Sequence, residues 1–167
     1  MKRILLLSAV LLFFFLSTGC SNTNTLNITD QSKVVLIPDG KGGQALTFST
    51  FIKNHSPKSS EPFYIEFEIN SSQLQSKLET SKSKMIVGEN TSGNAPGEIY
   101  EVKPHTVLQA GSTIRVEGKG EEVALEKLIT QSNAVKVRLL NKEHKIITSS
   151  SITSFGKDLT ADGIDNS

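Results

Sequence analysis

The strongest constraint on the fold of this chain is a stretch in which large apolar residues occupy every second position. Its apolar members are Phe63, Ile65, Phe67 and Ile69, and the residues that alternate with them are Tyr64, Glu66, Glu68 and Asn70. Side chains of a β-strand point alternately to the two faces of a sheet, so four groups should enter a core and two carboxylates should face water. This pattern is typical of an antiparallel sheet with one solvated face.

Further short strands are predicted by apolar alternation and by the turn residues that separate them. We expect strands at 34–37, 46–52, 85–87, 106–108, 114–116, 135–139 and 145–153, with turns at 38–43, 109–112 and 141–144. The segment 72–81 carries Leu74 and Leu78 at helical spacing, which favours one or two helical turns.

One longer helix is predicted near 121–131. Glu121 and Glu122 favour the positive end of a helix dipole, and Leu125 with Ile129 forms an apolar stripe at helical spacing. The chain as a whole therefore predicts a mainly all-β fold, an immunoglobulin-like antiparallel β-sandwich with one short helix. A small α+β sheet or an open barrel is the alternative.

The N-terminal segment has the three parts of an export signal. Lys2 and Arg3 form a positive end, and 4–16 is an apolar stretch with a single serine. As a helix this stretch would cover about 20 Å, short of the ~30 Å hydrocarbon core of a bilayer. Small residues then lead to Cys20, which is the only cysteine of the chain.

These residues resemble a bacterial lipoprotein signal peptide with its lipobox, whose usual pattern is Leu, a small residue, Gly or Ala, then Cys. Thr18, Gly19 and Cys20 match that pattern, whereas Ser17 stands in place of the usual Leu and Leu16 lies one position earlier. The resemblance covers the first 20 residues. It implies cleavage before Cys20 and a diacylglyceryl group on its Sγ, and it leaves open whether the amine also carries an acyl chain such as palmitate.

The expected domain organisation follows from this signal. Residues 1–19 would be the signal peptide, 20–26 the lipidated cysteine and a flexible tether, 27–155 a single mainly-β domain and 156–167 a polar tail. Removal of 19 of the 167 residues leaves 148, enough for one domain to bury a core without disulfides. It also leaves 16 basic and 17 acidic residues, so the charge gives no case for binding nucleic acid.

Residues that could carry chemistry are few. His55, His105 and His144 are the weak candidates for a metal site, because each lies beside loop residues without a second histidine at ligand spacing. Glu66 and Glu68 share one strand face at a separation that would suit paired carboxylates. A solvated sheet face is the simpler interpretation. The chain has no Gly-x-Ser-x-Gly elbow and no phosphate-binding loop motif, so we predict no catalytic residue, no enzyme activity, no cofactor and no metal.

The sequence therefore predicts a membrane-anchored lipoprotein on the extracytoplasmic face of the cell membrane, acting as a non-enzymatic binding or interaction module of the bacterial cell envelope. A Gram-positive bacterium is favoured, and in a diderm the outer membrane is the other location. Its partners would be the membrane, through the lipid on Cys20, and an envelope or membrane protein or a wall component. The loops 38–43 and 88–97 are the expected contact regions. The alternative is a small-ligand or metal-binding lipoprotein that feeds a membrane complex.

Overall fold

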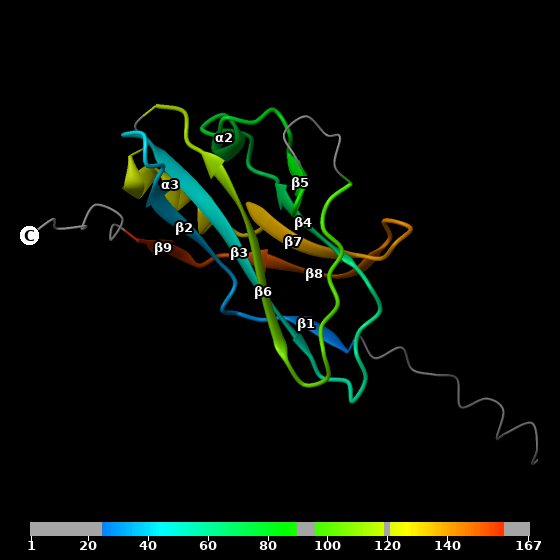
Figure 1. Cartoon of the computed structure of the whole chain (residues 1–167). Coiled ribbons are helices and arrows are strands. Elements are labelled where there is room, and N and C mark those ends of the chain that lie inside the picture. The colour runs from blue at the N-terminus through cyan, green and yellow to red at the C-terminus, as the bar shows by residue number, and fades with distance from the viewer. Residues whose placement is uncertain (1–24, 90–95, 119–120, 159–167) are drawn as a thin grey trace, which may run out of the picture.

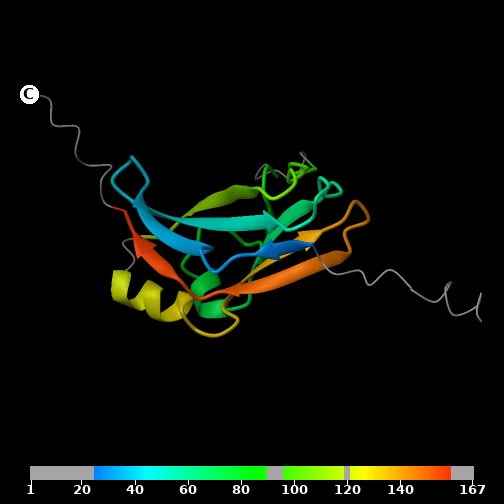
Figure 2. The ribbon, with the colours of Figure 1, turned by 90° about the horizontal axis from the view of Figure 1, so that it is seen from below.

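The computed structural model describes residues 25–89, 96–118 and 121–158 and shows two β-sheets packed face to face (Figures 1 and 2). The first, sheet 1, contains β1 (Leu26–Ile28), β2 (Lys33–Pro38), β3 (Gln44–Asn54), β6 (Val107–Arg115) and β9 (Phe155–Lys157). The second, sheet 2, contains in spatial order β5 (Lys84–Ile86), β4 (Tyr64–Ile69), β7 (Val135–Leu140) and β8 (Ile146–Ile152). The mainly-β sandwich with one short helix is confirmed.

Strand β3 pairs with three other strands of sheet 1, namely β1, β2 and β6. One of its edges pairs with β2 and β1 in succession, and the other pairs with β6 along almost its whole length. All these pairings are antiparallel. The exception in the described chain is β9, which lies parallel to β2 at the far edge of the sheet.

The core lies between the two sheets and is closed at one end by a helix. All four apolar residues of the alternating stretch, Phe63 to Ile69, are at most 2% exposed. Phe67 meets Phe48 of sheet 1 with ring centroids 5.8 Å apart, which joins the layers. Helix α3 (Glu122–Ile129) buries Leu125 and Ile129 against this core, as the sequence predicted.

The expectation that Glu66 and Glu68 face water is wrong. Both side chains do point away from the core, but they are only 8% and 9% exposed. Arg138 of the neighbouring strand β7 lies across them and covers both carboxylates. Long side chains that lie flat on a sheet can bury one another without belonging to a core.

The two strands predicted at 106–108 and 114–116, with a turn between them, are in fact the single nine-residue strand β6. Gly111 in its centre does not turn the chain. A Cβ atom on Gly111 would lie 2.4 Å from the carbonyl oxygen of Phe48, so glycine lets β3 and β6 approach closely. In the segment that leads to β6, Tyr100 forms a single bridge with Phe63.

The segment 72–81 contains one helical turn, α2 (Ser72–Gln75), at the short end of what the sequence allowed. The hairpin predicted from 135 to 153 is confirmed as β7 and β8. Strand β9 reaches Lys157, two residues into the segment expected to be a tail. Among the described residues, no helix combines the length and the apolar character that crossing a bilayer requires.

Candidate binding cleft

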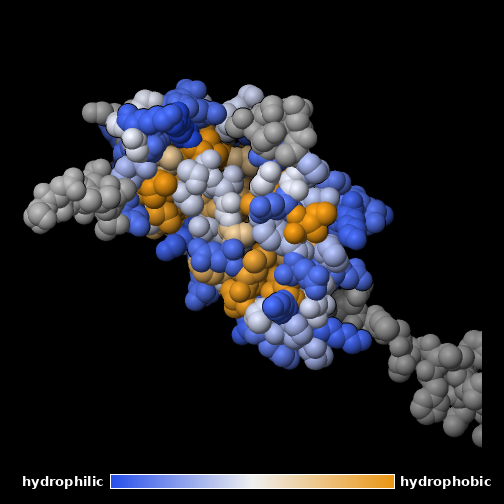
Figure 3. Space-filling model, viewed as in Figure 1, coloured by the Kyte–Doolittle hydropathy of each residue, from blue (hydrophilic) through white to orange (hydrophobic). Residues whose placement is uncertain are grey.

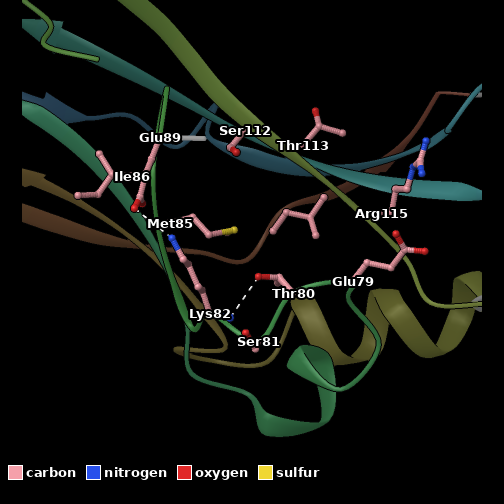
Figure 4. Close-up of a pocket in the computed structure, with 11 residues that line it drawn as sticks. Glu79, Thr80, Ser81, Lys82, Met85, Ile86, Glu89, Ser112, Thr113 and Arg115 are labelled. Carbon is pink, nitrogen blue, oxygen red and sulfur yellow. Dashed lines mark hydrogen bonds and ion pairs between the residues drawn. The ribbon is translucent and has the colours of Figure 1, made fainter. Parts of the chain in front are cut away.

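A cleft of about 540 Å³ opens where the edge strand of sheet 1 faces the edge strand of sheet 2 (Figure 4). One wall is the end of β6, Ser112–Arg115. The opposite wall is the segment Glu79–Lys82, together with Met85 and Ile86 of β5 and Glu89 beyond it. The volume lies within the range of about 300–1,000 Å³ that is usual for ligand pockets.

The connection between α2 and β5 closes one end of the cleft. The amide N–H of Glu79 donates to the carbonyl oxygen of Arg115 at 2.9 Å, and that of Glu117 donates to Lys77 at 2.8 Å. These two bonds flank a bridge between Leu78 and Val116, both buried. The bridge ties sheet 1 to the α2–β5 connection and so closes the cleft at the end of β6.

The cleft has an apolar floor and a polar rim. Met85 is 9% exposed, and Ile114 is partly buried against the core. Hydroxyl groups of Thr80, Ser81 and Ser112 lie around the opening (Figure 4). This composition suits an occupant with one or more apolar groups and a polar backbone or scaffold.

The cations that line the cleft are already paired. Nζ of Lys82 lies 3.0 Å from Oε1 of Glu89, on the wall opposite β6 (Figure 4). Arg115 Nε lies 3.5 Å from Asp39 Oδ2 and is thereby drawn toward the β2–β3 turn. With both cations neutralised, the lining offers no excess positive charge for an anionic ligand.

The loop 38–43, expected to make contacts, is a rigid turn next to this cleft. Oδ1 of Asp39 accepts hydrogen bonds from the backbone N–H groups of Lys41 and Gly43, each at 2.8 Å. These two donors lower the pKa of Asp39, and Arg115 adds to the effect. The turn is therefore connected to the β6 wall through a single ion pair.

The second expected contact loop, 88–97, is described only at its two ends. Gly88 and Gly97 both have positive φ angles, of 80° and 87°. The N–H of Glu98 donates a hydrogen bond to the carbonyl oxygen of Val87, which joins the two ends of the loop. Next to it the hydroxyl of Tyr100 donates to Glu98; burial and this carboxylate raise the pKa of Tyr100. The centre of the loop, 90–95, lies outside the described residues.

The three histidines proposed as weak metal candidates do not form a site. His55 follows β3 and His105 precedes β6, whereas His144 lies in the turn between β7 and β8 and stacks on Tyr64 at 5.0 Å. All three side chains are exposed. Nowhere in the part of the chain that the structure describes do three His, Cys, Asp or Glu side chains gather as metal ligands would.

Glu66 and Glu68 are held in an ion-pair ladder. Nη1 of Arg138 lies 3.3 Å from Glu66 Oε1, and its Nη2 bonds to Glu68. Nζ of Lys84, on the other side, lies 3.8 Å from Glu68. Cations therefore pair with both carboxylates, as in an ion-pair network that links neighbouring strands.

Sequence reasoning missed both the cleft and Arg138. The signal for Arg138 was present, since it alternates with Val137 and Leu139 on a predicted strand and so faces the same side as the two glutamates once β4 and β7 pair. No local signal indicated the cleft, because it forms where two strands from different sheets end side by side. Cys20, the predicted lipidation site, lies outside the described residues.

Comparison with known proteins adds no family. No protein-family model matches the chain, and no curated protein sequence matches it. Among solved structures it is similar to the Pseudomonas fluorescens alkylpurine DNA glycosylase AlkC bound to DNA containing an abasic site analog, with a TM-score of 0.38 and 8% identity. The match covers 80% of this chain and 31% of that chain. A likeness at this level carries no argument about fold or function.

Proposed function

We propose that this protein is a lipid-anchored lipoprotein on the extracytoplasmic face of the bacterial cell membrane, and that its β-sandwich is a non-enzymatic binding module. The observation that carries this proposal is the position of Cys20. It follows an apolar run and the small residues Thr18 and Gly19, and it stands six residues before Leu26, where the first strand begins. A short polar connection between a lipid and a folded domain is the arrangement expected of a surface-displayed module.

The pairing of charged groups in the described domain supports a role in binding. The cleft between β5 and β6 has paired charges, and the carboxylates of β4 are occupied by Arg138 and Lys84. On the face shown in Figure 3, hydrophobic residues form separate small areas among hydrophilic ones. Such a face lacks the large continuous apolar patch of an obligate interface, which favours a partner that binds locally.

The small-ligand lipoprotein remains a second candidate because one observation favours it. The cleft has the volume of a small-molecule pocket. Its two cations are paired, and the one lining charge without an ion-pair partner in the described chain, Glu79, is exposed to solvent. These groups leave little to orient a small charged molecule, so the binding of a macromolecular segment is our preferred function.

Replacement of Cys20 tests the anchor directly. The full-length chain, Cys20→Ala and the neighbouring control Ser21→Ala would be produced in a Gram-positive bacterium fed an alkyne-tagged fatty acid. We expect the wild type and Ser21→Ala to carry the tag, to lose the mass of residues 1–19 and to remain with washed membranes. Cys20→Ala should lose the tag and should either stay uncleaved or leave the membrane. An equal tag and equal size for Cys20→Ala would end the lipoprotein proposal.

A further inference from the structure

We propose that the partner binds as an extended peptide segment, which adds a strand to the free edge of β6 and places a side chain in the adjoining cleft. This inference rests on the binding function proposed above and names the kind of partner it serves. Two independent features support it, namely a row of unpaired backbone groups on β6 and a pocket beside the end of that row.

The register shows which backbone groups of β6 are free. The N–H of Val116 donates to Gln44, on the β3 side, whereas the carbonyl of Arg115 accepts from Glu79, on the opposite side. Successive residues of an antiparallel strand direct their backbone groups to alternate edges. The N–H and C=O groups at positions 107, 109, 111 and 113 therefore face away from β3. Within the described chain no strand pairs with them.

The free edge of β6 also lacks the usual protection against strand addition. Exposed edges are normally kept short or carry lysine, proline or other charges. Strand β5, the edge that faces it, has three residues and contains Lys84. Strand β9, at the far edge of sheet 1, also has three and contains Lys157. By contrast β6 is nine residues long, and its first eight residues include no charged residue and no proline.

The cleft begins where this edge ends and supplies a place for a side chain. Ser112 and Thr113 belong both to β6 and to the wall of the cleft. An added strand would lie about 4.8 Å from β6 in the plane of sheet 1, and every second side chain would point inward. One inward side chain would then reach the floor formed by Met85 and Ile114. This combination of backbone bonds along an edge and a pocket for an alternate side chain is the usual geometry of β-strand addition.

The chemistry of the cleft selects the occupant. Lys82 and Arg115 are paired with acidic partners, so the lining favours an apolar, uncharged side chain at the inward position. The wall formed by Glu79–Lys82 stands across from the end of β6. An added strand would need only the space directly beside β6, whereas the edge of a second copy would bring its whole sheet toward that wall. A peptide segment of another protein is therefore favoured over self-pairing.

Selection from a random linear peptide library against the full-length protein in detergent micelles tests the proposal. The peptide obtained is synthesised and its dissociation constant is measured with two variants at one position. Gln109→Pro removes an N–H that faces the free edge, whereas Gln109→Ala keeps that N–H and removes only the side chain. We expect Gln109→Pro to weaken binding by about tenfold or more, and Gln109→Ala to change it by less than about threefold.

Hydrogen exchange of the wild type keeps the test decisive should proline disturb β6. Peptide binding should slow exchange at the amides of Gln109, Gly111 and Thr113. Protection elsewhere, unchanged affinity of a folded Gln109→Pro protein, or no selected peptide at all would overturn the proposal. So would a wild-type dimer that Gln109→Pro converts to a monomer, since the edge would then belong to a second copy. If the protein binds the peptide but carries no lipid on Cys20, only the proposal of a lipid anchor is refuted. If it carries the lipid but binds no peptide, only the proposal of strand addition to β6 is refuted.

Discussion

Replacing Arg138 by methionine should destabilise the protein strongly, because one guanidinium neutralises two carboxylates on the outer face of sheet 2. Its Nη1 lies 3.3 Å from Glu66, and its Nη2 bonds to Glu68. Methionine keeps part of the apolar side chain but carries no charge. In the Arg138→Met protein, Glu68 would retain only Lys84 at 3.8 Å, and Glu66 would retain no ion-pair partner among the described residues.

The size of the effect follows from three quantities. A hydrogen bond to a charged group contributes about 1.5–3 kcal/mol, so the two lost bonds set an upper limit of about 6 kcal/mol. Water recovers part of this loss, since the side chain of Arg138 is 19% exposed. The two carboxylates, about 7 Å apart on one strand, then repel each other by about 1–2 kcal/mol at an effective dielectric constant of about 20–40. We expect a net loss of about 2–4 kcal/mol, as for a broken pair that is mostly buried.

Urea unfolding followed by far-ultraviolet circular dichroism measures this loss without requiring tryptophan, which the chain lacks. With an m-value of about 2 kcal/mol/M, the midpoint of Arg138→Met should fall by about 1–2 M. Lys136→Met is the matched control. It removes one positive charge from the same face of the same strand, at a residue that lies opposite Glu68 but forms no ion pair with it in the described chain, and should cost at most about 1 kcal/mol.

A combined variant separates charge pairing from packing. Glu66→Gln, Glu68→Gln and Arg138→Met together remove the three mostly buried charges of the ladder and leave only the exposed Lys84 without its partner, so this protein should recover a large part of the lost stability. Equal urea midpoints for Arg138→Met and Lys136→Met would refute the reasoning, because the ladder would then contribute nothing beyond an ordinary surface charge.

Two further predictions concern other polar contacts. Asn54→Ala should lower the free energy of unfolding by about 2–4 kcal/mol, because the buried amide donates to the carbonyls of Lys58 and Val102 and accepts from the N–H of Ser56. A decrease of the urea midpoint by less than about 0.5 M would contradict this prediction. Asp39→Asn should flatten the acid limb of the stability profile. Since its backbone hydrogen bonds lower the pKa of Asp39, the stabilisation is fully present above the ordinary pKa of 3.8 and is lost as the pH falls through the folded pKa. Denaturation profiles from about pH 6 to about pH 2 that run parallel for the two proteins would contradict it.

Much of the fold could be predicted because its elements have strong local patterns. The alternation around Phe67 specifies a strand with one buried face, and the stripe of Leu125 and Ile129 specifies a helix, whatever the rest of the chain does. The hairpin of β7 and β8 likewise has alternating residues on both sides of a polar turn.

The errors arose where long-range pairing decides the local structure. Glycine is common in turns, so Gly111 favours a turn when the sequence is read locally. In the structure, the missing side chain of Gly111 instead allows the backbone of Phe48 on the paired strand to approach. The burial of Glu66 likewise depends on which strand lies beside β4, because Arg138 is 72 residues away in the sequence. The cleft was beyond sequence reasoning for the same reason, since its walls come from different sheets.

The position of β1 and β9 along β3 has a consequence for the design of fusion proteins. Leu26 is paired with Asn54, whereas Lys157 is level with Leu36 and hence with Leu46, eight residues back along the same strand. At about 3.3 Å per residue, the points at which the described chain enters and leaves the sandwich are about 26 Å apart along the strand direction. With a lipid on Cys20, Leu26 lies within about 20 Å of the acylated residue. A reporter joined directly after Asp158 would then be presented from the opposite end of the sandwich, leaving the anchored end unobstructed.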